Sequence, residues 1–406
     1  MAEPKVRFKK DDGSSYPAWN DVFLGDIATR VSRKNANGET DRPLTIASIE
    51  GLVDQRTYFG KTIASKDMSG YFLLKNGEYA YNKSYSAGYD YGSIKRLDKY
   101  DMGALSTLYI CFALNKDQNT DFYDCYFNGL SWYNQMPQIC AEGARNHGLL
   151  NVSSNDFFKI RLSVPSSKEE QQKIADFLSS VDKVITASEE EVANLETQKK
   201  AVMKKVFSQE VRFKRADGSD FPEWEETLVR DIGTVVTGNT PPTKEEDNYG
   251  GAYLWVSPAD IVANQYVYNT AKTLSDKGWS VARHLPAGSV LVTCIASIGK
   301  NSILATKGSC NQQINAIIPN GKMLPHFILE AVNYKEHDLQ LLGGNGGMKI
   351  VSKSLFEAFE LPFPCFEEQR LIADFLSDFD EAIAAAKKEL ERWKELKKGL
   401  LQQMFV

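Results

Sequence analysis

The 406-residue sequence lacks the features that mark membrane, secreted and zinc-binding proteins. No apolar stretch approaches the roughly twenty residues that a membrane-spanning helix needs. The first residues, MAEPKVRFKKDDGSSYP, contain no apolar core of a signal peptide. The six cysteines form no CxxC pair and only four histidines are present, which disfavours a zinc site at the usual ligand spacing. We therefore expect a cytoplasmic protein without membrane association or bound metal, whose thiols are reduced and mostly buried.

An excess of positive charge is also missing. The formal net charge is −5, and no segment of the chain is strongly basic. Because contacts to phosphates depend on Lys and Arg, nucleic-acid binding would require cations from distant parts of the chain to gather on one face.

Catalytic motifs are absent as well. The stretches GKT at 60–62 and SIGKN at 297–301 lack the upstream glycine of a phosphate-binding loop. No Ser/His/Asp set stands out, and no glycine-rich cofactor motif follows an expected strand. The chain is therefore expected to be non-catalytic, with no cofactor of its own.

What the sequence does contain is an internal duplication. VRFKKDDGSSYPAW at 6–19 matches VRFKRADGSDFPEW at 211–224, with nine of fourteen positions identical. EEQQKIADFLSSVD at 169–182 matches EEQRLIADFLSDFD at 367–380, with ten of fourteen identical. Two matching frames around dissimilar inserts predict a pseudo-two-fold repeat within one chain.

Each copy of the second motif opens a long amphipathic helix. Apolar residues recur at alternating steps of four and three, which is the heptad pattern of a helix that packs against another helix. Both stripes share one register, down to a polar break at Lys199 and Lys397. We expect the two helices to pair antiparallel, through an interface formed by Ile174, Leu178, Val181, Ile185, Val192, Leu195, Ile372, Leu376, Phe379, Ile383, Leu390 and Trp393.

The inserts read as mixed α/β modules. Runs of β-branched and aromatic residues bounded by Gly and Asn predict strands in both. The sequence thus predicts an α+β fold with two mixed α/β domains, two long antiparallel coiled-coil helices that join them, and a pseudo-two-fold internal repeat. The expected boundaries are a first domain at 1–165, a first helix at 166–210, a second domain at 211–364 and a second helix at 365–406.

Two classes of function fit a non-catalytic chain of this kind. One is a DNA-binding module that holds two different readers at a fixed spacing. The other is a protein-interaction scaffold with two adaptor domains. Polar residues in expected turns, such as Thr240, Asn311 and Gln312, would suit base edges or phosphates as well as ordinary loops.

The motifs together resemble a known family. The repeated EEQ..IADFLS helix starts, with GNTPPT, LWVSPADI, GSVLVTCIASIGKNSIL and CNQQINAIIP in the second insert, are similar to the specificity (S) subunit of Type I restriction–modification enzymes. The stretch ASIEGLVDQRTYFGKTIASKDMSGYFLLKNGEYAYNKS at 47–84 looks like another target-recognition domain of that family.

The resemblance implies a function and a set of partners. The inserts would be target-recognition domains that each read one half of a bipartite site in double-stranded DNA, and the helices would set the gap between the halves. Two modification subunits would bind this chain and methylate adenine N6, and restriction subunits would add ATP-dependent cleavage. S-adenosylmethionine, ATP and Mg²⁺ are expected on these partner subunits and not on this chain.

Ten residues are expected to include DNA contacts, because they are polar or cationic and lie in expected loops or at strand ends. They are Arg56, Lys61, Lys66, Lys83 and Arg145 in the first insert, and Thr240, Lys244, Lys272, Lys300 and Lys349 in the second.

Overall fold

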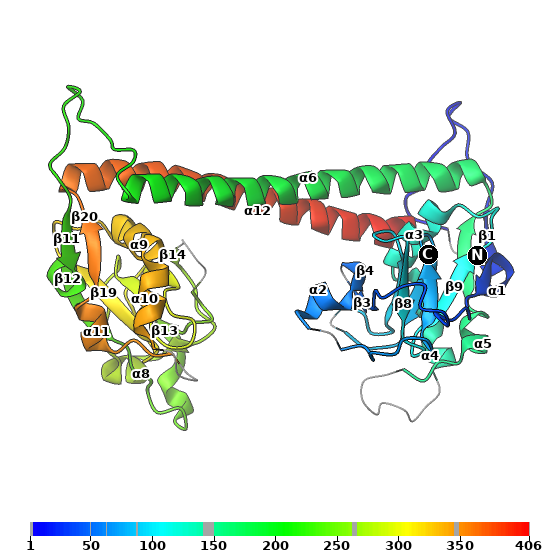
Figure 1. The fold of residues 1–406 in the computed structure, drawn as a ribbon, viewed down its shortest axis with the longest axis horizontal. Helices are drawn as coiled ribbons and strands as arrows, with labels where there is room; N and C mark the ends of the chain where they lie inside the picture. Colours follow the sequence, from blue (N-terminus) through cyan, green and yellow to red (C-terminus); the bar gives the residue numbers. More distant parts are fainter. Residues whose placement is uncertain are drawn as a thin grey trace. The chain divides into compact units, whose positions relative to one another are not determined.

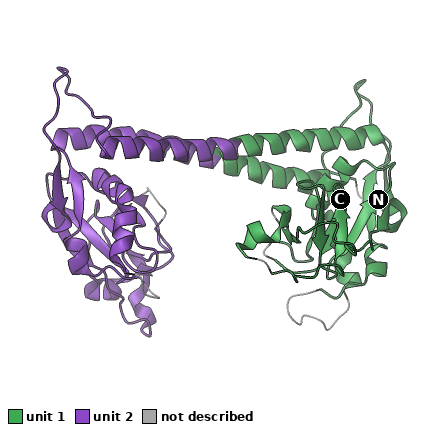
Figure 2. Cartoon of the chain, viewed as in Figure 1, with its two compact units in different colours: residues 1–187, 389–406 green, residues 188–388 purple. Residues whose placement is uncertain are grey.

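The computed structural model describes residues 3–48, 50–61, 63–86, 88–140, 150–261, 266–344 and 349–405. The chain forms two compact units: unit 1 comprises residues 1–187 and 389–406, and unit 2 comprises residues 188–388 (Figure 2). Two long helices, α6 (Lys168–Phe207) and α12 (Phe366–Met404), which are labelled in Figure 1, each contribute one part to each unit (Figure 2). In the described part of the chain, no helix is both long and apolar enough to cross a bilayer.

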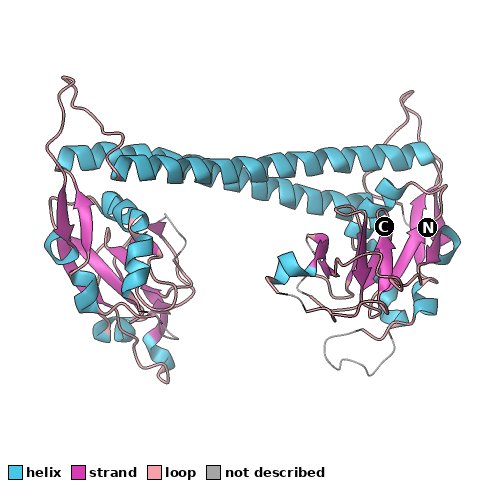
Figure 3. Cartoon of the chain, in the orientation of Figure 1, coloured by secondary structure: helices cyan, strands magenta, loops and turns pink. Residues whose placement is uncertain are grey.

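Unit 1 mixes strands and short helices (Figure 3). Its central sheet has the strand order β2-β9-β6-β7, and the pairs β1-β10, β3-β4 and β5-β8 surround it. The strands are β1 (Trp19–Phe23), β2 (Ala28–Arg30), β3 (Leu44–Ala47), β4 (Gly51–Asp54), β5 (Phe72–Lys75), β6 (Tyr79–Asn82), β7 (Ser93–Arg96), β8 (Met102–Leu105), β9 (Ile110–Leu114) and β10 (Arg161–Pro165). The helices are α1 (Leu24–Ile27), α2 (Gln55–Phe59), α3 (Thr120–Asn128), α4 (Met136–Ile139) and α5 (Ser154–Phe157).

Unit 2 has a five-stranded sheet of order β12-β19-β16-β17-β14, a three-stranded sheet β15-β13-β18 and the pair β11-β20. The strands are β11 (Glu225–Leu228), β12 (Gly233–Thr237), β13 (Tyr249–Val256), β14 (Tyr266–Val267), β15 (Thr273–Leu274), β16 (Val290–Thr293), β17 (Asn301–Leu304), β18 (Gly308–Cys310), β19 (Ile314–Pro319) and β20 (Glu360–Phe363). The helices are α7 (Val229–Ile232), α8 (Asp276–Val281), α9 (Pro325–Tyr334), α10 (Glu336–Leu342) and α11 (Lys353–Glu357).

The two domains share a strand topology that is not evident from their sequences. β2-β9-β6-β7 in unit 1 and β12-β19-β16-β17 in unit 2 have the same strand order, and every pair in both sets is antiparallel. The flanking elements also correspond: α1 and α7 precede the first strand, and α3 and α9 follow the last one. The repeat therefore extends through the inserts.

The two inserts end in the same local structure, a short capped helix followed by a strand. Ser153 caps α5 by accepting a hydrogen bond from the Asp156 amide, and Ser352 caps α11 by accepting one from the Leu355 amide. In each case the next strand pairs with the first strand of its unit, as β1-β10 or β11-β20. This pair closes the domain, and the following residues start the long helix.

Within each unit the two helix halves pair antiparallel. In unit 2, Glu196 of α6 meets Lys387 of α12 at 2.6 Å, and the later residue Lys199 meets the earlier residue Asp380 at 2.7 Å. In unit 1, Asp182 meets Lys397 at 2.5 Å, and the start of α6 shares the core with Met404 near the end of α12. The predicted fold class, with two mixed domains and a long antiparallel helix pair, is confirmed.

Candidate nucleic-acid interface and helix junctions

The first repeated motif folds against the start of each long helix. Arg7 donates from Nε and Nη2 to the two carboxylate oxygens of Glu170, at 3.0 and 2.9 Å, and the Trp19 indole donates to the same carboxylate at 3.4 Å. The Glu170 side chain is fully buried. A buried carboxylate needs such donors because its desolvation is otherwise uncompensated.

Unit 2 repeats this arrangement. Arg212 donates to both oxygens of the buried Glu368 at 3.3 and 3.0 Å, and the Trp224 indole donates to it at 3.1 Å. The two repeated motifs therefore recur together because each supplies half of one buried network. The sequence motif gives no sign that Glu170 and Glu368 are buried and bound to arginine.

Unit 2 contains a second polar network, which we call junction 2 (Lys199, Glu330 and Asp380). The Lys199 ammonium of α6 lies 2.6 Å from Glu330 Oε1 on α9, and 2.7 and 2.8 Å from the two oxygens of Asp380 on α12. Lys199 is 5% exposed and Glu330 is fully buried. Burial raises the pKa of Glu330, and the nearby Lys199 opposes that shift.

Junction 2 also offers a possible ligand set for a cation. His326 Nε2 lies 3.8 Å from Glu330 and 3.5 Å from Asp380, and these three groups fall within 4.8 Å of one another. The Lys199 ammonium already contacts both carboxylates. It supplies the positive charge that two carboxylates require, so the residues present do not call for a metal ion.

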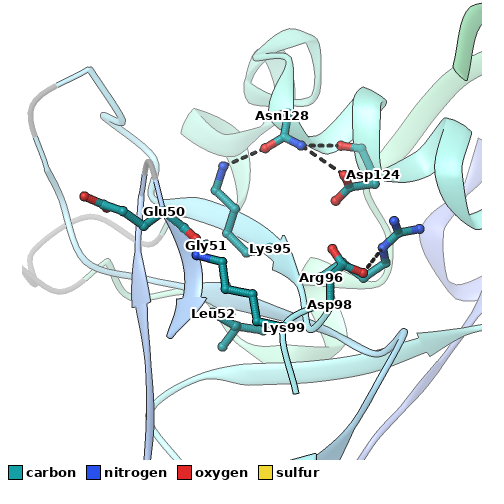
Figure 4. Close-up of a pocket in the computed structure, with 9 residues that line it drawn as sticks. All are labelled: Glu50, Gly51, Leu52, Lys95, Arg96, Asp98, Lys99, Asp124 and Asn128. Carbon is teal, nitrogen blue, oxygen red and sulfur yellow. Dashed lines mark hydrogen bonds and ion pairs between the residues drawn. The ribbon is translucent and has the colours of Figure 1, made fainter. Parts of the chain in front are cut away.

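Unit 1 has a corresponding network, junction 1 (Asp124, Asp182 and Lys397). Lys397 of α12 pairs with Asp182 of α6, and it also interacts electrostatically with the half-buried carboxylate of Asp124 on α3. Asp124 lines a pocket of about 140 Å³ together with Lys95, Arg96 and Asn128 (Figure 4).

The cations of this pocket are held by protein groups. The Lys95 ammonium donates to Asn128 Oδ1 at 2.6 Å, and Asn128 donates to the Asp124 carbonyl at 2.9 Å (Figure 4). Arg96 pairs with Asp98 and Asp121 at 2.7 and 2.8 Å. Burial lowers the pKa of Lys95 to about 8. The charged and polar groups that line this pocket therefore bind one another and stabilise the structure beside junction 1.

The candidate DNA-contacting surface of unit 2 lies at one edge of the five-stranded sheet. β12 and β16 end at this edge and β17 and β19 begin there, as the pairs Thr237 with Asn315 and Val292 with Asn301 show. The loops at 238–240, 294–300 and 311–313 consequently emerge side by side. We call these loops the reader edge of unit 2.

Hydrogen bonds join these loops. Thr240 Oγ1 donates to Gln312 Oε1 at 2.5 Å, and the Cys294 amide donates to the Gln313 carbonyl at 2.8 Å. Gly238 allows a close approach, since a Cβ there would lie 2.1 Å from the Cys310 carbonyl. Ala296 has φ +62°, an uncommon conformation for a non-glycine residue, in the β16–β17 turn. The loops form one connected polar surface.

Of the five residues predicted in the second insert, Thr240, Lys300 and Lys349 lie at this edge, and Lys244 and Lys272 lie farther from it. Lys300 ends the β16–β17 turn, and the Lys349 carbonyl accepts from the Ala296 amide of the same turn at 3.1 Å. Lys244 is exposed in the loop after Thr240, and Lys272 stands 5.8 Å from the ring of Tyr249, whose hydroxyl donates to Pro241.

The predicted residues of unit 1 come from separate segments of the first insert. Lys83 lies in the β6–β7 connection, which corresponds to the turn that carries Lys300, and burial lowers its pKa. Arg56, Lys61 and Lys66 lie on or after α2, away from that connection in sequence. The Arg56 guanidinium is engaged by Asp54 at 2.8 Å. Arg145 lies outside the described residues.

Sequence reasoning missed Arg283 and the amides around it. Arg283 is exposed at the reader edge, where its side chain donates to the Thr237 carbonyl at 2.6 Å and its amide donates to Asn239 Oδ1 at 2.8 Å. Nothing in the segment SVARHLP signals this position, because the edge is formed by strand pairing across the insert.

The twelve residues proposed for the helix interface are all buried or half-buried. Ile174, Leu178, Val181, Val192, Ile372, Leu376, Ile383 and Leu390 are buried, and Ile185, Leu195, Phe379 and Trp393 are half-buried. Several also pack into the domains: Ile174 and Leu178 belong to a core cluster of unit 1, and Ile372 and Leu376 to one of unit 2. The helix pair is thus continuous with both cores.

Comparison with known proteins identifies the family. The domain described as "Type I restriction modification DNA specificity domain" matches this chain twice, at residues 18–197 and 222–392. These matches cover most of the chain and coincide with the internal duplication. The chain therefore belongs to the Type I restriction–modification specificity family.

Curated relatives carry the same description. The MjaIX specificity subunit of Methanocaldococcus jannaschii is 29% identical over 208 residues, which are 49% of this chain and 48% of that protein. The putative MjaX specificity subunit of the same organism is 25% identical over 302 residues, covering 72% of this chain and 68% of that protein. The chain thus matches about half the length of one relative and two thirds of the other.

Solved structures share the fold. The S subunit of a Type I restriction–modification system from M. genitalium superposes with a TM-score of 0.55 at 14% identity, covering all of this chain and 99% of the other. A chain from a study of "complex assembly and conformational transition of the type I R-M system" gives 0.58 at 16% identity, covering 96% and 98%. At this identity the likeness concerns the fold.

Proposed function

We propose that this chain is the DNA-specificity subunit of a Type I restriction–modification complex, in which each domain reads one half of a bipartite target. The observation that carries the proposal is the shared four-stranded frame, which presents unlike loops at the same sheet edge in both units. One frame with two sets of loops suits two different half-sites recognised in a common geometry.

The reader edge of unit 2 supports direct reading of bases. Gln312 is exposed, and its amide is oriented by Thr240. Asn and Gln amides form paired hydrogen bonds with adenine in the major groove, while Lys and Arg bind phosphates or guanine. Lys300, Lys349 and Arg283 are exposed cations of the same sheet edge and would hold the DNA backbone.

The helix pair would fix the gap between the half-sites and dock two modification subunits. Each unit exposes the same apolar group beside the start of its long helix. Phe8 and Phe177 meet edge to face in unit 1 at 5.6 Å, as Phe213 and Phe375 do in unit 2 at 5.6 Å. Phe177 and Phe375 are each 37% exposed.

In unit 2 this group lines a groove of about 360 Å³. We call the two sites the twin apolar surfaces (Phe8 with Phe177, and Phe213 with Phe375). The same surface on two unlike domains suits two copies of one partner. The modification subunits would transfer methyl groups from S-adenosylmethionine to adenine N6, and restriction subunits would cleave DNA with ATP and Mg²⁺. This chain would carry no catalytic group, and the complex would act in the cytoplasm.

Mapping of methylated adenine in cells with and without this gene tests the proposal. A bipartite motif with an unspecified gap should be methylated only when the gene and its modification partner are both present. The competing function, a protein-interaction scaffold, predicts no change in methylation and no salt-dependent DNA binding by the assembled complex. That result would refute the proposal.

A further inference from the structure

Each unit contains one lysine that interrupts the apolar stripe of a long helix. Lys199 in α6 and Lys397 in α12 occupy equivalent heptad positions, where apolar residues would otherwise continue the seam. Both reach an aspartate of the opposite helix: Lys199 reaches Asp380 at 2.7 Å and Lys397 reaches Asp182 at 2.5 Å.

The two pairs specify the same register. Lys199 lies seventeen residues after Asp182 in α6, and Asp380 lies seventeen residues before Lys397 in α12. In an antiparallel pair, one alignment of the helices therefore satisfies both ion pairs. A shift by one heptad would move the helices by about 10 Å, which would place each lysine opposite a different residue and separate both pairs.

Each junction also includes the domain beside it. Lys199 belongs to the helix that starts after β10 of unit 1, yet it contacts Glu330 on α9 of unit 2. Lys397 belongs to the helix that starts after β20 of unit 2, and it interacts with Asp124 on α3 of unit 1. Helices α3 and α9 are equivalent elements, since each follows the last strand of the shared frame.

The energetics favour a role in alignment over one in stability. In junction 2, where Lys199 and Glu330 are buried, the ion pairs gain little over a well-packed apolar replacement, because desolvation of the charges offsets their attraction. A polar group in a heptad seam, however, excludes the registers in which it would remain unpaired. The rest of the seam is largely apolar and tolerates a heptad shift far better.

We propose that Lys199 with Asp380 and Glu330, and Lys397 with Asp182, are positioning residues that fix where each incoming helix stops against the opposite domain. They thereby set the single gap length between the two half-sites. This inference rests on the proposed function, because the gap has meaning only for a bipartite DNA target.

A variant with apolar residues in place of junction 2 distinguishes a role in helix alignment from a role in stability. The variant Lys199→Leu/Glu330→Leu/Asp380→Leu removes all three charges together, so no buried charge is left unpaired. We expect its melting temperature to stay the same or rise, while the methylated motif retains both half-sites but appears with two or more gap lengths. A folded variant that keeps the one wild-type gap would overturn the inference.

A charge exchange at junction 1 gives a second test if the apolar variant does not fold. Lys397→Asp alone places like charges together, and we expect it to lose the single gap or the methylation. Lys397→Asp/Asp182→Lys restores an ion pair in the same register and should recover the wild-type gap. Failure of the exchange to recover what the single variant loses would contradict the inference.

The pair Glu196 and Lys387 provides a matched control for the buried junction 2. It joins the same two helices at 2.6 Å, but both side chains are 50% exposed, so water screens it. Glu196→Ala/Lys387→Ala should leave the gap unchanged. If the unaltered chain directs no bipartite methylation, the proposed function fails; if it does and the junction variants keep its gap, only the junction inference fails.

Discussion

At the scale of single residues, the duplicated motifs are explained by two buried carboxylates. Glu170 and Glu368 are fully buried, and each receives two guanidinium hydrogen bonds and an indole hydrogen bond. Removal of one partner of such a group leaves a charge in the interior that nothing compensates. The arginine and tryptophan of the first motif therefore cannot vary independently of the glutamate in the second.

Arg7→Ala should consequently destabilise unit 1 by about 3 kcal/mol or more, since Glu170 would remain buried with only the indole as donor. Denaturant unfolding would measure this change. Glu3→Ala is the control, because Glu3 pairs with the same arginine at 3.4 Å but its side chain is 57% exposed, and it should change stability by less than about 1 kcal/mol. Equal effects of the two variants would contradict the assignment.

Lys95 should make stability depend on pH. Its pKa is lowered by burial to about 8, whereas a lysine in the unfolded chain titrates near 10.4. Between these values the unfolded chain binds more protons than the folded chain, so the free energy of unfolding contributed by this group rises with pH.

Replacement by methionine should remove this contribution. We expect the difference in unfolding free energy, wild type minus Lys95→Met, to increase from pH 8 to pH 10.5. Urea titrations at several pH values in that window would measure it. Parallel pH profiles for the two proteins would show that Lys95 is not the group responsible.

At the scale of elements, sequence predicts the long helices well and the sheets poorly. The heptad stripe from Ile174 to Val206 is a local pattern, and it predicts the 40-residue helix α6 because each position reports its own burial. The four-stranded frame depends on pairings such as Thr237 with Asn315, far apart in the chain. Strands of three to six residues carry too little periodicity to reveal such partners, so the equivalence of the two inserts was missed.

For the candidate DNA contacts, too, the sequence predicts local placement but not which segments come together. Thr240, Lys300 and Lys349 come from three separate segments, and only the sheet edge brings them together. A turn-rich sequence predicts that each is in a loop, but not that the loops adjoin, and Arg283 gave no local signal at all.

Single substitutions at the reader edge should separate base reading from phosphate binding. Gln312→Ala should relax specificity at one base pair of one half-site, with a loss of about 1–3 kcal/mol in discrimination. Lys300→Ala should weaken binding to all sequences and reduce the salt dependence of affinity. Binding of the assembled complex to a panel of single-base variants would measure both.

Lys322 offers the matched control for this experiment. It is exposed beyond Pro319, at the opposite end of β19 from the reader edge. Lys322→Ala should therefore change neither specificity nor salt dependence. An equal loss in all three variants would count against this edge as the DNA-contacting surface.

The twin apolar surfaces make a prediction about assembly. Phe177→Ser and Phe375→Ser change partly exposed rings at equivalent places, so each should remove one modification subunit and the double variant should remove both. Native mass spectrometry of the purified complex would count the subunits. Retention of two modification subunits by the double variant would place the docking surface elsewhere.

At the scale of the whole molecule, the internal duplication gives one chain two copies of the same structural frame while allowing its two domains to differ. The frame strands, the buried Glu–Arg networks and the helix junctions are all present twice. The loops at the sheet edges are the parts that are not repeated. Under the proposed function, recognition and spacing would depend on separate residues, and each should change without the other.

Exchange of the reading part of unit 2 tests this central claim most directly. Residues 233–319 would be replaced by the equivalent segment of a family member with a different target, and methylated adenine would be mapped in cells that contain the modification subunit. We expect a new second half-site, with the first half-site and the gap unchanged. A change in the first half-site or in the gap, or an unaltered motif from a folded chimera, would contradict this expectation.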